Sequence, residues 1–184
     1  MKEHLVSVII PTYKRGNYLK RAIDSVLCQT YCSIEIIVVD DNNEGDIYRG
    51  NIEMLMKDYE VYKNVKYIKH KKNMNGSAAR NTGIRNSNGD FITFLDDDDE
   101  YEKHKIEKQV EILTILPLEY GAVYGGYKII RGNRAISVVH PSKNGRLTSD
   151  LLQMTWGTGS GSNVLFRKRV FEKIGLFDES LIRH

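Results

Sequence analysis

The sequence is poor in cysteine and has neither a long apolar run nor a leader-like start. Its two cysteines, Cys28 and Cys32, have no cysteine or histidine partners at the spacing of a metal site, which predicts free thiols in a reducing compartment. No apolar stretch approaches the roughly 20 residues that a membrane span needs, and no signal peptide opens the chain. We therefore expect a cytoplasmic protein, or a soluble part of a larger one.

A strong excess of charge of one sign is also missing. The 184 residues carry a net charge of +3, which suits an anionic ligand but is too small and too evenly spread to indicate nucleic-acid binding. The densest basic patch, formed by Lys66 and residues 69–72, fits a solvated strand edge as well as a phosphate or membrane-surface role. A hydrophobic content of 41% predicts one ordinary globular domain with its own core.

Alternating apolar runs and helical periodicities predict a β-α-β-α-β-α-β order in the first hundred residues. We expect strands at 6–10, 34–39, 65–68 and 91–95. We also expect three helices, of which the first begins at Asn17 and the other two cover 47–58 and 76–85. Pro11 is expected to end the first strand, and Asn17 to cap the first helix. This order predicts an α/β fold with a Rossmann-like, mostly parallel central sheet and helices on both of its faces.

The second half of the same domain is expected to be more variable. Its predicted elements are a helix at 103–116, strands at 122–124, 128–130, 135–139 and 163–166, a flexible glycine-serine loop at 157–162, and a helix at 170–174. The strand at 135–139 is expected to pair with the two strands before it. The composition therefore suggests a nucleotide-binding half at 1–100 and a variable half at 101–184.

The most informative segment covers residues 91–100, where an apolar strand runs straight into five acidic residues. Side chains of an extended chain alternate between faces, so Asp96 and Asp98 are expected to point one way, and Asp97 and Asp99 the other. Two carboxylates on one side of a strand end suit a hard divalent cation that keeps positions for phosphate oxygens. The segment therefore predicts a cation site.

Three polar clusters follow predicted strand ends, at residues 11–15, 40–43 and 96–100. Because ligands of parallel sheets bind beyond the carboxyl ends of the strands, we expect these clusters to converge on one site. The first cluster is followed by a single glycine, Gly16, and matches neither a P-loop nor a dinucleotide-binding spacing. Phosphate charge would then be balanced by a metal together with Arg or Lys, and Arg80 is a candidate.

Ordered motifs along almost the whole chain resemble those of the family 2 glycosyltransferases, which have the GT-A fold. The motifs are residues 6–13 (VSVIIPTY), 25–31 (SVLCQTY), 35–41 (EIIVVDD), 79–84 (ARNTGI), 94–99 (FLDDDD) and 170–179 (VFEKIGLFDE). Each motif is weak alone, but the ordered set is highly specific.

The resemblance implies a metal-dependent, inverting enzyme that moves a sugar from a nucleotide-diphosphate donor, with UDP favoured, to a saccharide or lipid-linked acceptor. It assigns donor binding to Pro11, Thr12, Tyr13, Arg15, Asp41, Arg80, Asp96 and Asp97, and metal binding to Asp98. Asp41 is expected to accept a hydrogen bond from the base, and Asp97 to lie near the ribose. Mn²⁺ or Mg²⁺ on Asp98 would stabilise negative charge on the departing diphosphate.

Several residues have a structural alternative that the sequence leaves open. Asp40 could cap the turn after its strand, Tyr13 could pack in the core, and Arg80 could pair with an aspartate. Trp156 could stack on an acceptor sugar or pack in the core. Surface or packing roles are expected for the isolated histidines His70, His104 and His140.

One part of the family pattern is expected beyond the end of the sequence. An inverting transferase needs a carboxylate general base, and in the family this base lies downstream of a Phe-Asp-Glu segment. Here that segment is residues 177–179, and the sequence stops at His184. We expect Asp178 and Glu179 to be structural, the acceptor-side half at 101–184 to be incomplete, and the chain to bind donor and metal with little or no sugar transfer.

Two other interpretations stay open at this point. One is a non-catalytic fragment that binds a nucleotide-sugar; the other is a sugar nucleotidyltransferase, which would normally carry a glycine-rich basic loop that residues 11–15 lack. The resemblance further implies synthesis of surface polysaccharide at the cytoplasmic face of the membrane. Peripheral membrane association and a homo-oligomer both fit this role, and neither the donor sugar nor the acceptor can be read from the sequence.

Overall fold

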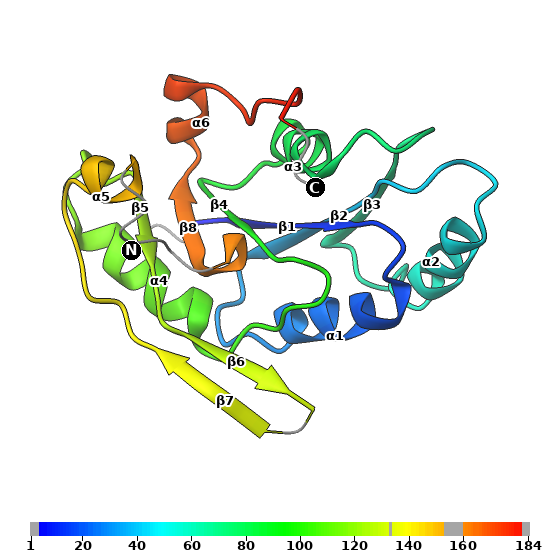
Figure 1. The fold of residues 1–184 in the computed structure, drawn as a ribbon, viewed down its shortest axis with the longest axis horizontal. Coiled ribbons are helices and arrows are strands. Elements are labelled where there is room, and N and C mark those ends of the chain that lie inside the picture. The colour runs from blue at the N-terminus through cyan, green and yellow to red at the C-terminus, as the bar shows by residue number, and fades with distance from the viewer. Residues whose placement is uncertain (1–3, 133, 153–159, 182–184) are drawn as a thin grey trace.

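Figure 1 shows the chain as a computed structural model, which describes residues 4–132, 134–152 and 160–181. Strands and helices alternate through the first hundred residues, as predicted. The elements are β1 (Val6–Thr12), α1 (Gly16–Leu27), β2 (Ile34–Asp40), α2 (Ile47–Lys57), β3 (Val65–Lys69), α3 (Gly76–Arg85), β4 (Phe91–Phe94), α4 (Lys105–Ile115), β5 (Ala122–Tyr124), β6 (Tyr127–Arg131), β7 (Arg134–Val139), α5 (Thr148–Leu152), β8 (Val164–Arg167) and α6 (Arg169–Ile174).

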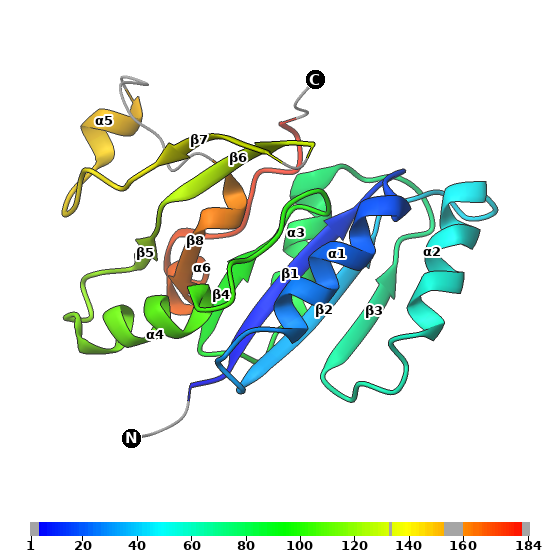
Figure 2. The same cartoon turned by 90° about the horizontal axis from the view of Figure 1, so that it is seen from below.

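One six-stranded sheet forms the centre of the molecule, with the strand order β3-β2-β1-β4-β8-β5. The first four strands in this order are parallel, whereas β8 runs antiparallel to both β4 and β5. Helices α3 and α6 lie on one face of the sheet and α1 and α2 on the other, and α1 lies in front of the sheet when the molecule is seen from below (Figures 1 and 2). The predicted α/β fold with a mostly parallel sheet covered on both faces is confirmed.

Alternating side chains of β1 divide the core into two parts. Val6, Val8 and Ile10 pack with apolar side chains of α1, α2 and α4, whereas Ile9 packs against α3 on the other face. Because both faces of the central strands are covered, their sequences read as continuous apolar runs. Each such side chain stabilises the fold by about 1.5–3 kcal/mol, and together they fix the strand ends that carry the polar loops.

Strand β1 continues through Pro11 to Thr12, so the expectation that Pro11 ends the strand is wrong. The Leu95 amide donates to the Ile9 carbonyl, which places the polar backbone groups of Ile9 on the β4 side of β1. Pro11 lies two residues further on, and its backbone faces the same side, where β4 has already ended. The missing N–H of Pro11 therefore removes no hydrogen bond between β1 and β2.

Helix α1 begins two residues earlier than its sequence signal suggested. Its N-cap is Arg15, without a side-chain capping bond, so the expected cap at Asn17 is wrong. The buried stripe of Leu19, Ala22, Ile23 and Val26 agrees with the predicted periodicity. Hydrophobic packing, rather than capping, determines where this helix lies.

The second half departs from the main sheet. Strands β6 and β7 form a separate two-stranded hairpin, so the predicted pairing of 135–139 involves β6 but not β5. Strand β8 begins at Val164, after a short 3₁₀ turn at Gly161–Asn163. Residues 157–159 of the expected glycine-serine loop lie outside the described residues. No helix in the described part of the chain is long and apolar enough to cross a membrane. Both cysteines are free and exposed.

Candidate functional site

The loops after β1, β2 and β4 meet at one edge of the sheet. The Asp41 amide donates to the Thr12 carbonyl at 2.9 Å, and the Lys14 amide donates to Asn42 Oδ1 at 3.0 Å. Thr12 Oγ1 donates to Asp97 Oδ2 at 2.7 Å. The expected convergence of the three polar clusters is therefore confirmed.

The acidic run after β4 folds as a turn and not as an extended strand. The Asp99 amide donates to the Asp96 carbonyl at 2.9 Å, the hydrogen bond that closes a β-turn. The predicted alternation of faces is therefore wrong. Arg15 Nη1 lies 3.6 Å from Asp97 Oδ1 and 2.6 Å from Asp98 Oδ2, so one guanidinium group approaches two adjacent carboxylates.

Asp97 is the buried member of this pair. Burial raises the pKa of its carboxyl to about 6, and the neighbouring charge of Asp98 adds to the shift, while Thr12 and Arg15 oppose it. The carboxylate is thus ionised at neutral pH in surroundings that disfavour its charge. Because a bound cation would relieve this cost, the electrostatics of the turn favour a cationic ligand.

Asp96 pairs with Arg80 across the edge of the site. Arg80 Nη2 donates to Asp96 Oδ1 at 2.6 Å, and both side chains are partly exposed. Arg80 comes from α3, which packs on β1 and so brings the guanidinium group to the acidic turn. This ion pair is the structural alternative considered for Arg80, and a role in phosphate binding stays a prediction.

Two serines from the second half close the acidic turn. The hydroxyls of Ser160 and Ser162 donate to Asp99 Oδ2 at 2.9 and 2.6 Å, and Ser162 Oγ accepts from the Asp96 amide at 2.9 Å. These contacts were not predicted, because residues 157–162 were expected to form a flexible loop. The carboxylate of Asp99 is accordingly held by two hydroxyls.

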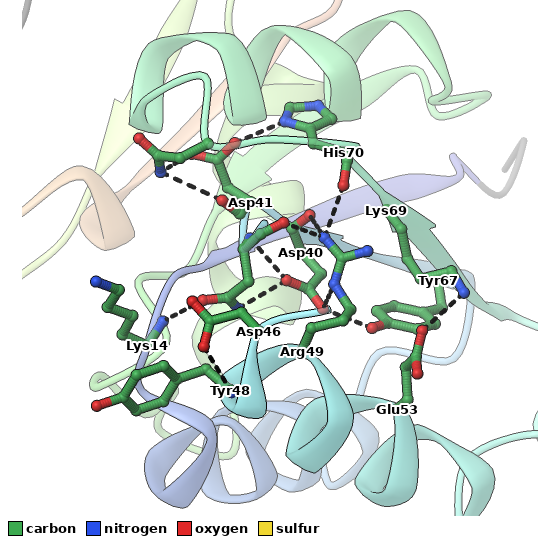
Figure 3. Close-up of polar contacts among 12 residues, drawn as sticks. Lys14, Asp40, Asp41, Asp46, Tyr48, Arg49, Glu53, Tyr67, Lys69 and His70 are labelled. Atoms are coloured by element: carbon green, nitrogen blue, oxygen red, sulfur yellow. Dashed lines mark hydrogen bonds and ion pairs between the residues drawn. The ribbon is translucent and has the colours of Figure 1, made fainter. Parts of the chain in front are cut away.

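Asp41 is buried beside His70, as Figure 3 shows. Its Oδ1 accepts from the Met74 amide at 2.8 Å and lies 2.7 Å from His70 Nδ1, and its Oδ2 accepts from the side-chain amide of Asn73 at 2.8 Å. His70 Nε2 in turn lies 2.9 Å from Thr82 Oγ1. His70 is therefore a packing residue, one of the two roles expected for it, and it has two polar partners.

Asp40 forms a buried ion pair with Arg49 (Figure 3). Arg49 Nε lies 2.8 Å from Asp40 Oδ2, close enough for an ion pair but outside the angles of a hydrogen bond. The same carboxylate oxygen accepts from the Tyr67 hydroxyl at 2.6 Å. Arg49 Nη2 donates to the carbonyls of Asp40, Asn42 and His70, and so ties the ends of β2 and β3 together.

Arg49 and His70 could have been found in the sequence. Arg49 precedes Ile52 and Met56 by three and seven residues, which places it on the buried stripe of α2. His70 directly follows β3, at the edge where the other polar clusters gather. A helical arginine on a buried face needs an acidic partner, and Asp40 ends the buried strand that comes before this helix.

The loop after β1 presents an exposed tyrosine. Tyr13 is exposed, so the alternative that it packs in the core is wrong, and its ring centroid lies 5.0 Å from Lys14 Nζ. Lys14 itself has a φ of 60°, a left-handed conformation that costs roughly 1–2 kcal/mol in a residue with a Cβ. The hydrogen bond from its amide to Asn42 helps to hold this conformation. Pro11 is partly buried beneath the loop.

The acidic turn fits a divalent cation that takes most of its ligands from a substrate. Within the ranges that the structure describes, no group of three or more His, Cys, Asp or Glu could hold a metal alone. Asp98 is half-exposed and adjoins the unfavourably buried charge of Asp97. Mg²⁺ and similar ions are commonly held by one or two carboxylates together with substrate phosphates, and this turn offers that arrangement.

Two further features lie apart from the acidic turn. A hollow of about 550 Å³ is lined by Arg49, Glu53, Lys69 and His70, among others, and contains none of the acidic turn residues.

The C-terminal segment is anchored on α3. Glu179 accepts from Asn81 at 2.8 Å and from Arg85 at 3.3 Å, which agrees with its expected structural role. Asp178 accepts from Ser180. Trp156 lies outside the described residues.

Comparisons with known proteins all point to one family. The model of Glycosyl transferase family 2 matches residues 7–175. An uncharacterized glycosyltransferase of Rickettsia conorii is 37% identical over 182 residues, covering 96% of this chain and 29% of the relative. The Escherichia coli UDP-Glc:alpha-D-GlcNAc-diphosphoundecaprenol beta-1,3-glucosyltransferase WfgD is 32% identical over 168 residues, covering 91% of this chain and 62% of that protein. The chain thus spans less than two thirds of either relative.

Solved structures share the fold at low sequence identity. S. aureus TarS 1–349 in complex with UDP superposes with a TM-score of 0.72 at 21% identity, covering 96% of this chain and 51% of that one. The mannosyltransferase PcManGT of Pyrobaculum calidifontis, in complex with GDP-Man and Mn²⁺, gives a TM-score of 0.71 at 17% identity, covering 98% and 49%. The expected GT-A fold is confirmed.

Proposed function

This chain belongs to glycosyl transferase family 2, and from that membership we propose that it binds a nucleotide-diphosphate sugar, with a UDP-sugar favoured, for transfer to a saccharide or lipid-linked acceptor. The E. coli relative is named for a UDP-sugar and a diphosphoundecaprenol-linked acceptor, which supports both choices. The TarS complex with UDP supports the donor class. An acceptor of this kind would place the chain at the cytoplasmic face of a membrane.

The convergence of Thr12, Arg15 and Arg80 on the acidic turn carries the proposal. Two guanidinium groups and a cation-favouring turn lie at the carboxyl ends of parallel strands, where ligands of such sheets bind. Both arginines are partly exposed, so each can exchange its carboxylate partner for a phosphate oxygen. We further propose that Asp97, which accepts a hydrogen bond from Thr12 at this edge, binds close to the ribose.

Asp41 is proposed to read the nucleobase. Its Oδ2 accepts one hydrogen bond, from Asn73, and a carboxylate oxygen can accept two, which leaves a position for a base N–H. Uracil and guanine both carry such an N–H group. Tyr13, exposed at the end of β1, offers a ring on which the base can stack.

A divalent cation, Mn²⁺ or Mg²⁺, would be held by Asp98. When bound, it supplies Lewis-acid stabilisation of the negative charge on the diphosphate leaving group. The protein's own part is to hold the diphosphate between Arg15 and Arg80 and to keep Asp96 and Asp99 fixed through Ser160 and Ser162. Their fixed positions limit reorganisation as charge develops.

The proposal includes an inverting displacement, in which a general base takes the proton of the acceptor hydroxyl. Neither acidic residue of the 177–179 segment is proposed as that base, because Glu179 is engaged with α3 and Asp178 with Ser180. On this proposal the 184-residue chain binds donor and cation with little or no sugar transfer. Transfer at the rate of an intact enzyme by a chain with both Asp178→Ala and Glu179→Ala would contradict it.

Calorimetric titration with UDP and GDP, with and without Mn²⁺, tests the donor site. We expect Mn²⁺-dependent UDP binding that Asp98→Ala weakens at least tenfold. Asp58→Ala, which removes an exposed carboxylate at the end of α2, is the matched control and should leave binding unchanged. Preference for GDP would correct the donor class, and binding of neither nucleotide would overturn the proposal.

A further inference from the structure

The β6–β7 hairpin stands apart from the core. In Figure 1 it projects away from the central sheet. All its described residues are exposed except Tyr127 and Val139 at its base. Four aliphatic side chains are 45% to 63% exposed, namely Ile129, Ile130, Ile136 and Val138. A soluble domain seldom gathers so many exposed aliphatic residues in one small element unless they meet a partner.

The charge around the hairpin has one sign. Residues 120–149 contain five of the 27 Lys and Arg residues and none of the 24 Asp and Glu residues, so the remainder of the chain is net negative. Lys128 reaches Glu102 at 2.7 Å, and Lys143 pairs with Asp150. Arg131 and Arg134, which flank the hairpin turn, form no ion pair within the described ranges. The turn therefore carries uncompensated positive charge.

Cationic and aliphatic side chains share the same surface. Arg131 pairs with Arg134 in the strand register, and Ile129 lies two residues before Arg131 on β6, so these three side chains are on one face. Lys128 and Ile130 lie on the other face, and the register of the two strands shifts between Ile129 and Ile130. A ribbon that offers cations and aliphatic groups together, without any carboxylate, matches the chemistry of an anionic lipid surface. There, phosphate groups attract the cations and the interface accepts the aliphatic groups.

We propose that the β6–β7 hairpin docks on the surface of an anionic lipid bilayer. Arg131 and Arg134 contact headgroup phosphates, and Ile129 on the same face enters the interface beside them. A second copy of the chain is a poorer occupant, because pairing two hairpins would bring Arg131 and Arg134 of each copy together. This inference goes beyond donor binding and does not depend on it, since the hairpin contains none of the residues assigned to the donor site.

Vesicle co-sedimentation in the absence of nucleotide tests the proposal. The chain is mixed with vesicles of phosphatidylcholine alone or with phosphatidylglycerol added at about a third of the lipid. We expect binding to the mixed vesicles, at least tenfold weaker binding to phosphatidylcholine alone, and loss of binding as the salt concentration rises. Equal binding to both vesicle types, or no binding to either, would overturn the proposal.

Paired variants locate the surface. Arg131→Glu with Arg134→Glu should weaken binding to the mixed vesicles at least tenfold, and Ile129→Ser should weaken it several-fold. The matched controls, Lys57→Glu with Lys63→Glu and Val61→Ser, change exposed residues elsewhere and should weaken it less. Equal loss in hairpin and control variants would overturn the assignment to this hairpin.

Two readouts separate this proposal from its rivals. Titration with UDP should give the same affinity in the Arg131→Glu, Arg134→Glu variant as in the unmodified chain. An unchanged affinity would show that the variant is folded and that the hairpin is separate from the donor site. Sedimentation equilibrium without lipid should show the same mass for both. A dimer that the double variant abolishes, or hairpin-dependent binding to an acidic protein but not to vesicles, would overturn the bilayer as the occupant.

Discussion

Two neighbouring carboxylates of the acidic turn are held in very different surroundings. Asp97 is buried against Thr12, whereas Asp98 is half-exposed beside Arg15. The raised pKa of Asp97 arises mainly from burial and shows that the fold keeps a charge where it is unfavourable. Such strain is expected where a ligand later neutralises the charge.

Asp97 should make stability depend on pH. Its native pKa of about 6 lies above the usual Asp value of 3.8, so the folded state binds the proton more tightly than the unfolded state. Ionisation of the buried Asp97 carboxyl therefore destabilises the folded state. This loss of folding free energy is absent below about pH 4, grows between pH 4 and 6, and is complete above pH 6. Asp97→Asn should therefore raise the free energy of unfolding by about 2–3 kcal/mol at pH 8 and by almost nothing at pH 4.

Urea unfolding of both chains across this pH range measures the difference. Asp58→Asn, at an exposed position, is the control and should show no such trend. A stability difference for Asp97→Asn that is the same at pH 4 and pH 8 would show that burial does not shift this carboxyl.

Arg49 should be far more important for stability than its exposed neighbour Lys69. Arg49→Met leaves the Asp40 carboxylate buried without its cation, which should lower the free energy of unfolding by about 3–5 kcal/mol. Lys69→Met breaks the exposed pair with Glu53, at 2.9 Å, and should cost under about 1 kcal/mol. Chemical denaturation compares the two, and similar losses would show that Arg49 is not the residue that ties β2 to β3.

Helix α3 packs so closely on β1 that its position depends on a glycine. A Cβ at Gly83 would lie 2.3 Å from Ile9 Cγ2, too close for any real contact. The same helix carries Arg80 to the acidic turn and Asn81 to the C-terminal segment. The close approach of helix and strand therefore sets the position of a candidate phosphate-binding residue.

Replacing this glycine should destabilise the fold in spite of a better helix propensity. Gly83→Ala should lower the free energy of unfolding by about 1–3 kcal/mol, because Ile9 or the helix must move. Gly50→Ala is the matched control in α2, where a Cβ would meet nothing within 4 Å, and it should stabilise by about 0.5–1 kcal/mol. Thermal or urea unfolding reports both, and stabilisation by Gly83→Ala would contradict the packing account.

Sequence patterns predicted the elements well where burial sets the pattern, and poorly where backbone geometry does. The continuous apolar runs of β1 and β2 and the stripe of α1 were readable because both faces of the sheet are covered. The continuation of β1 through Pro11 could not be read from the sequence, since the strand tolerates a proline there only because β4 has already ended. The turn at Asp96 to Asp99 was also missed, because a run of aspartates does not reveal its own hydrogen bonds.

At the scale of the whole molecule, the arrangement of the strand ends could be predicted from the order of the elements, whereas individual side-chain partners could not. The alternation of strands and helices was enough to predict that three polar clusters meet at one edge, and Thr12, Asp41 and Asp97 do meet there. The partners of the buried charges were not predicted, because the position of Arg49 on the buried stripe of α2, or of His70 after β3, does not show which carboxylate each one meets. The separate β6–β7 hairpin was likewise visible only once the register of β5 was known.

The central claim, that the strand-end site binds a nucleoside diphosphate through a cation, is tested most directly by a crystal structure with UDP and Mn²⁺. Anomalous scattering would locate the manganese. We predict that it lies within coordination distance of Asp98, with the diphosphate between Arg15 and Arg80 and the base beside Asp41. Manganese and UDP bound elsewhere, for example in the hollow lined by Glu53 and Lys69, would contradict the account.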